Sequence, residues 1–93
     1  MEKNKESNIV FINSKDNYRI QMNRLIGCLN KRKNCVIKTR GKAIYNAINL
    51  VGFATKQNNK IRVKKVKIGS EIFHTPEGKD INIPEIEISL EMS

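Results

Sequence analysis

The strongest constraint on this chain's fold is the alternation of two short apolar runs with two segments of helical periodicity. The runs IVFI, at residues 9–12, and CVI, at residues 35–37, are typical of short buried strands. A helix is predicted after each run, from about residue 16 to 30 and from about 43 to 56. Two strands joined by a helix crossover are expected to lie parallel in one sheet, so the pattern predicts an α/β fold.

Apolar residues at helical spacing mark the face of each helix that should be buried. Ser14 or Asp16 is expected to cap the first helix, and residues 30–34 (NKRKN) should form a polar connection. The predicted buried residues are Tyr18, Met22, Leu25, Ile26 and Leu29 in the first helix, and Ala43, Ile44, Ala47, Ile48 and Val51 in the second.

The last third of the chain predicts two long strands around a turn-rich tip at residues 74–80. The apolar alternation changes phase at Lys64-Lys65, which predicts a β-bulge. It changes again at Pro84, which indicates an edge or bulge position because proline donates no ladder hydrogen bond. The predicted fold is a two-layer α/β sandwich in the order β-α-β-α-β-β, with a four-stranded mixed sheet, two helices and a long C-terminal hairpin. Residues 1–8 should be a disordered tail, and 9–93 a single domain.

The charge of the chain favours a polyanionic partner. Net charge is +9, and it is uneven: residues 1–67 hold 17 basic and 3 acidic side chains, a net +14. Residues 68–93 hold one basic and six acidic side chains, a net −5. We therefore expect one strongly positive side and one mildly negative side, as in a protein that presents one face to a nucleic acid.

Several classes of function are disfavoured by what the sequence lacks. Cys28 and Cys35 have no metal-ligand spacing, so no metal or other cofactor is expected, and both should be reduced core residues of an intracellular protein. No apolar run is long enough for a membrane span. His74 has no evident carboxylate partner, and the acids Glu85, Glu87 and Glu91 look like a solvated face or a protection against edge pairing, so no catalytic residue is predicted.

The candidate binding residues lie where each short strand is expected to end. The turn after the second strand carries Lys38, Arg40, Gly41 and Lys42 directly before a helix, whose free amides attract phosphate. Loops that follow parallel strands emerge at the same sheet edge, so Lys15, with Arg19 in the first helical turn, should lie near Arg40 and Lys42.

The sequence resembles the Alba family of small DNA- and RNA-binding chromatin proteins. The resemblance runs through NIVFIN, IKTRGKAIYNAIN, IRVKKVKIGSEI and PEGKDINIPEIEISL, and covers nearly everything after the first eight residues. It implies the β-α-β-α-β-β fold, which is similar to the C-terminal domain of initiation factor 3. It also implies a homodimer, binding along a nucleic-acid backbone, and a hairpin arm that reaches toward a groove.

The resemblance also assigns positions to the family's basic residues. A lysine pair after the first strand falls on Ser14 and Lys15, and only Lys15 is basic. The basic residues of the strand-to-helix turn fall on Lys38, Arg40 and Lys42, and the two hairpin-tip positions on Lys79 and Asn82. Asp16 stands where the family usually has proline. These departures predict a somewhat weaker or altered binder.

The expected function is sequence-nonspecific binding of double-stranded DNA or RNA by a basic dimer surface, with coating and compaction, in the cytoplasm and on the chromosome. The alternative is an RNA-binding subunit of a ribonucleoprotein such as ribonuclease P, in which a heterodimer with a paralogue is expected. A nuclease would need a convergent carboxylate cluster or an activated nucleophile, and the sequence indicates neither. DNA and RNA stay equally open, because phosphate contacts do not read the 2′-hydroxyl. No small-molecule substrate and no membrane partner are expected.

Overall fold

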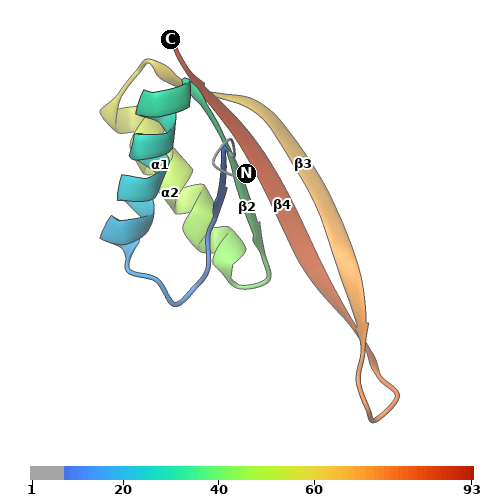
Figure 1. Ribbon diagram of the computed structural model, residues 1–93. Helices are drawn as coiled ribbons and strands as arrows, with labels where there is room; N and C mark the ends of the chain where they lie inside the picture. Colours follow the sequence, from blue (N-terminus) through green and yellow to red (C-terminus); the bar gives the residue numbers. More distant parts are fainter. Residues whose placement is uncertain (1–7) are drawn as a thin grey trace, which may run out of the picture.

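A computed structural model describes residues 8–93 and confirms the predicted order of elements (Figure 1). The elements are β1 (Ile9–Phe11), α1 (Tyr18–Arg32), β2 (Asn34–Arg40), α2 (Ala43–Gln57), β3 (Ile61–His74) and β4 (Asp80–Met92). Of the tail predicted to be disordered, residues 1–7 lie outside the described residues. The backbone carbonyl of Asn8 accepts a hydrogen bond of 2.8 Å from the amide of Val36, so sheet pairing begins at this residue.

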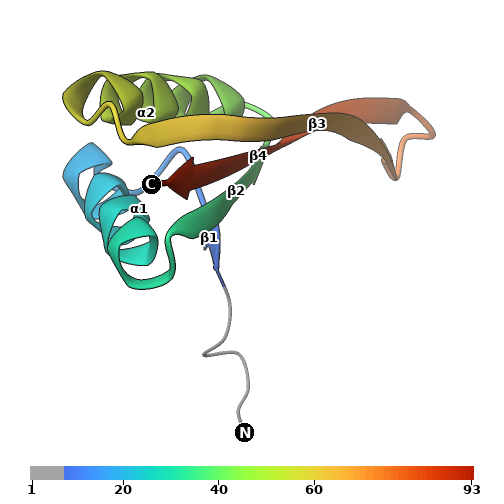
Figure 2. The same cartoon turned by 90° about the horizontal axis from the view of Figure 1, so that it is seen from above.

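The sheet has the strand order β1-β2-β4-β3, with β1 parallel to β2 and the other pairs antiparallel. Both helices lie on one side of it, and the hairpin of β3 and β4 extends past them as an arm (Figures 1 and 2). The core lies between the helices and the sheet. Its most completely buried side chains are Leu25, Leu29, Cys35, Ile37, Leu50 and Leu90.

The ends of α1 differ from the prediction. Asn17 is the N-cap, and its side chain accepts a hydrogen bond of 2.7 Å from the amide of Arg19. Neither Ser14 nor Asp16 caps the helix, because Asp16 belongs to a turn in the preceding loop. The prediction of a polar connection at residues 30–34 is also wrong. The helix continues to Arg32, and the left-handed residue Lys33 ends it by donating its amide to the carbonyl of Leu29 at 2.8 Å.

Strand β2 is longer than its apolar run. It continues through Arg40, because β4 pairs with it along its whole length. Cys35, Ile37 and Thr39 are buried under the helices, so the alternating residues Val36, Lys38 and Arg40 lie on the open face of the sheet. Lys38 and Arg40, which were predicted to lie in a turn, are therefore strand residues.

The hairpin confirms the predicted bulge. Val63 pairs with Leu90 and Lys65 pairs with Ser89, so Lys64 is the extra residue. Pro84 causes no bulge, since it pairs in register with Ser70. It lies instead just beyond the end of β2, where β4 has only β3 as a neighbour, so the missing amide breaks no ladder.

Parts of the predicted helix faces are exposed. Tyr18 is 47% exposed and Ile48 51%, although both were assigned to the core. The apolar arc of each helix is wider than the surface that the sheet covers. Tyr18 packs its ring edge-to-face on Phe53 of α2, with the ring centroids 6.0 Å apart. The arm also carries exposed apolar side chains, among them Ile68 at 82%.

Candidate nucleic-acid interface

The loop after β1 and the turn after β2 lie at the same end of the molecule, and the hairpin tip projects beyond them (Figure 1). This follows from the parallel pairing of β1 with β2, as predicted. The end of the sheet therefore gathers Lys15, Arg40 and Lys42, while Lys79 is carried farther out by the arm.

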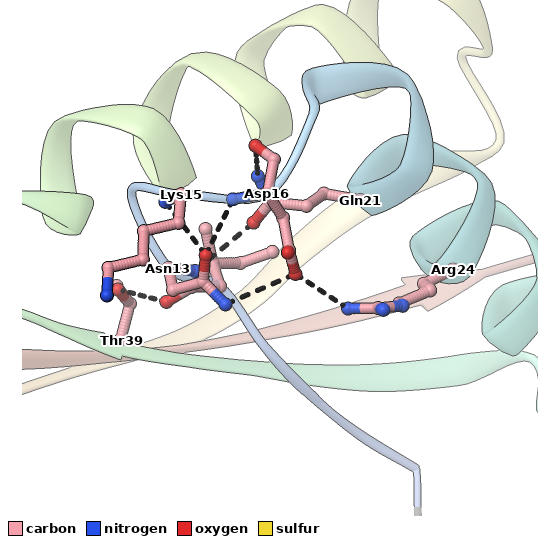
Figure 3. Close-up of polar contacts among 7 residues, drawn as sticks. Asn13, Lys15, Asp16, Gln21, Arg24 and Thr39 are labelled. Carbon is pink, nitrogen blue, oxygen red and sulfur yellow. Dashed lines mark hydrogen bonds and ion pairs between the residues drawn. The ribbon is translucent and has the colours of Figure 1, made fainter.

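The loop that carries Lys15 is held by a buried glutamine (Figure 3). The side-chain oxygen of Asn13 accepts the amides of Lys15 at 2.9 Å and Asp16 at 2.8 Å. Gln21, only 3% exposed, accepts the amide of Asn13 at 3.2 Å and donates to the carbonyl of Asp16 at 3.0 Å. The Asp16 carboxylate lies 3.2 Å from Arg24, and the Lys15 side chain extends away from that pair in Figure 3. The loop backbone is thus fixed, while Lys15 remains exposed.

The turn between β2 and α2 shapes the start of helix α2. Gly41 has a φ of +65° and donates its amide to the carbonyl of Pro84 at 2.9 Å. Helix α2 then begins at Ala43 without a side-chain cap and without an acidic residue in its first turn. Lys42 is exposed at the N-cap position. Uncapped amides, the positive end of the helix dipole and a lysine together favour a phosphate oxygen here.

Lys38 lies within a row of charges across three strands. Its ammonium is 3.4 Å from one carboxylate oxygen of Glu87 on β4, and Lys67 on β3 is 3.6 Å from the other. The acidic residues of β4 therefore lie between basic strands. The expected separation of a positive and a negative side is wrong at this face, because β4 pairs with both β2 and β3. This position also removes the proposed role of the β4 acids in protecting an edge.

Arg40 is tied to the arm. Its guanidinium donates to the carboxylate of Glu71 at 2.9 Å and lies 5.8 Å from the ring centroid of Phe73. Both partners lie on β3. The residue that was predicted to grip phosphate thus already has an anionic partner.

The remaining predicted cations are exposed. Arg19 lies in the first turn of α1, and Lys79 follows a tip in which the Thr75 amide donates to the Lys79 carbonyl at 2.8 Å. Within residues 8–93, Lys15, Arg19, Lys42 and Lys79 form no ion pair. Among the predicted binding residues, these four are the cations most available to a polyanion.

A groove of about 560 Å³ runs along the ends of β1 and β2. It is lined by Phe11, Ile12, Asn13, Ser14, Lys38, Thr39, Arg40, Lys42 and Ala43. Phe11 and Gln21 were not predicted as site residues. The only sequence signal for Gln21 is its position four residues before Leu25, on the buried stripe of α1.

One side chain that was considered for catalysis, His74, has a partner that the sequence did not indicate. His74 does have a carboxylate partner, since its Nδ1 lies 2.6 Å from Asp80 directly across the hairpin. Both side chains are largely exposed. Residues 8–93 contain no cluster of three or more His, Cys, Asp or Glu side chains that could hold a metal.

Burial and the adjacent Cys28 thiol raise the pKa of Cys35, and both cysteines are free. No helix of the described part of the chain is long and apolar enough to cross a membrane.

The chain is thus a small α/β sandwich with a hairpin arm and a basic end of the sheet. Alba from Thermoplasma volcanium has this fold, with a TM-score of 0.77 and 21% identity over 89% of this chain and 98% of that one. ALBA1 from Trypanosoma brucei is similar too, with a TM-score of 0.72 and 18% identity over 92% of this chain and 69% of that one.

Sequence similarity gives the family. The chain is 30% identical over 86 residues to the DNA/RNA-binding protein Alba of Methanococcus maripaludis, covering 89% of this chain and 96% of that protein. This chain therefore belongs to the Alba family, as the resemblance implied. No family model matches the sequence.

Proposed function

We propose that this protein binds double-stranded DNA, RNA or both along the phosphate backbone, with little sequence preference. The observation that carries the proposal is that the loop with Lys15 and the turn with Lys42 lie at one end of the sheet, beside the uncapped start of α2. The name of the relative from Methanococcus maripaludis, a DNA/RNA-binding protein, supports it.

The proposed mechanism is electrostatic. Each lysine that contacts a phosphate releases condensed counterions, which gives affinity without sequence information. One phosphate would lie at the start of α2, within reach of Lys42, and Lys79 would extend the contact from the arm. Arg40 can bind a phosphate with two hydrogen bonds once it leaves Glu71. In this mechanism the protein acts by binding alone. It works inside the cell, on the chromosome or on RNA transcripts.

A homodimer is part of the proposal. It is supported by apolar side chains on the face of the arm that continues the core. Val66 and Ile68 pair with Ile88 and Ile86, so they lie on the helix-bearing face, yet the helices do not reach them. A second copy would bury this surface and would bring two basic ends into one particle. Sedimentation of the wild type and of Ile68→Lys tests this: the wild type should sediment as a dimer and the variant as a monomer.

The test of the binding proposal is a fluorescence-anisotropy titration with random-sequence duplex DNA and duplex RNA at several salt concentrations. Affinity for both duplexes that falls steeply with salt supports a general backbone binder. Preference for RNA would favour the ribonucleoprotein subunit instead. Absence of binding to either duplex at low salt would contradict the proposal.

A further inference from the structure

The ring of Phe11 is an unexpected feature of the basic end. It is 66% exposed, although it belongs to the apolar run that predicted a buried strand. In β1 only Val10 points under the helices, so Ile9 and Phe11 lie on the open face of the sheet. Phe11 pairs in register with Lys38 of β2, which lies on the same face.

The surroundings of this ring are cationic. Phe11 lines the 560 Å³ groove together with Lys38, Arg40 and Lys42. The groove volume falls in the range of roughly 300–1,000 Å³ that is usual for sites of small organic ligands. An exposed aromatic face with cations beside it matches one chemical unit in particular, a flat base joined to a phosphate.

We propose that Phe11 is a stacking site for an unpaired nucleobase, with the adjoining phosphate bound by Lys42 at the start of α2. Bases within a duplex are stacked on each other and cannot lie on the ring, so the site selects single-stranded nucleic acid. The inference rests on the proposed function, and it adds a substrate class that duplex coating does not include.

The chain contains no tryptophan, which permits a direct test. In Phe11→Trp, the indole is the sole tryptophan and lies in the groove. Addition of oligothymidylate should quench its emission, because a stacked base quenches indole fluorescence. The matched control is Phe53→Trp, on an exposed part of α2 outside the groove, whose emission should change little. Equal quenching in both variants, or none in either, would overturn the proposal.

Affinity gives the second readout. Loss of one stacked base should weaken binding about tenfold, so Phe11→Leu should lose about that factor for oligothymidylate. Its affinity for random-sequence duplex should stay within about twofold of the wild type. Equal losses of affinity for the two ligands would overturn the stacking site, as would no loss for either. Duplex binding at the wild-type level would keep the proposed function intact in both cases.

If the wild type bound no duplex, the proposed function would fail, and quenching in Phe11→Trp would still report on the stacking site. A concentration-dependent change in Phe11→Trp emission without oligonucleotide would show that a second copy covers the ring, and would also overturn the proposal.

Discussion

Arg40 of β2 and Glu71 of β3 form an ion pair of 2.9 Å across the intervening strand β4. Glu71 belongs to the arm, and Arg40 is the last residue of β2 before the turn that leads to α2. Both side chains are about half exposed, so the pair contributes at most about 1 kcal/mol to stability. Its larger consequence concerns binding, because Glu71 competes with any phosphate for the guanidinium.

Glu71→Gln should therefore raise the affinity for duplex DNA about threefold, since the competing charge is worth roughly 0.2–1 kcal/mol. Glu91→Gln is the matched control: it removes the same charge and frees Arg62, whose 2.8 Å pair lies at the other end of the hairpin. Anisotropy titrations with duplex DNA measure the affinity of both variants. An equal gain in affinity in both variants would mean that only the net charge matters. No gain in affinity in Glu71→Gln would show that Glu71 does not compete with phosphate for Arg40.

The buried side chain of Gln21 should be needed for the loop that carries Lys15. Gln21→Met keeps the volume but leaves the Asn13 amide and the Asp16 carbonyl without their partner, which costs about 1–3 kcal/mol. Urea unfolding measures this loss. Gln57→Met, at the exposed end of α2, should change stability by less than about 0.5 kcal/mol. Equal stability of both variants would mean that water replaces Gln21 in the loop.

The positive φ of Gly41 gives a prediction of opposite signs for two glycines. A Cβ on Gly41 would meet nothing closer than 3.8 Å, so the penalty of Gly41→Ala comes from the left-handed backbone and is about 1–2 kcal/mol. Gly52 lies within α2 with open space around it, so Gly52→Ala should stabilise by up to about 1 kcal/mol. Thermal unfolding should place the two variants on opposite sides of the wild type.

Burial of the Cys35 thiol predicts a loss of stability at high pH. Its pKa is raised above the ordinary 9.0 by burial and by the neighbouring Cys28 thiol. Above pH 9.0 the unfolded chain releases this proton and the folded chain does not, so stability is full below that pH and falls above it. The slope from this group approaches about 1.4 kcal/mol per pH unit. Urea unfolding of the wild type and Cys35→Ala at increasing pH should show this slope only in the wild type, and parallel curves would contradict it.

Local patterns in the sequence predicted the order of elements, the bulge beside Lys64 and the meeting of the loops after β1 and β2. These features depend on residues close together in the chain, or on the general rule for parallel strands. The ion pairs of Lys38 and Arg40 could not be predicted in this way. They depend on β4 lying between β2 and β3, which is a long-range arrangement.

The same limit applies to single side chains at the site. Periodicity identified IVFI as a strand, but it could not indicate that only one face of this strand is covered, and so it missed the exposed ring of Phe11. Gln21 was missed because a polar residue on a buried stripe has meaning only once its partners in the loop are known.

The most direct test of the central claim compares two double variants at opposite ends of the molecule. Lys15→Gln with Lys42→Gln removes two charges at the proposed interface, and Lys56→Gln with Lys60→Gln removes two at the far end, near the end of α2 and the start of β3 (Figure 1). The measurement is the salt dependence of anisotropy with random-sequence duplex DNA. The first variant should lower the slope by about two, while the second should leave it close to that of the wild type. Equal losses in the two variants would contradict a localised interface.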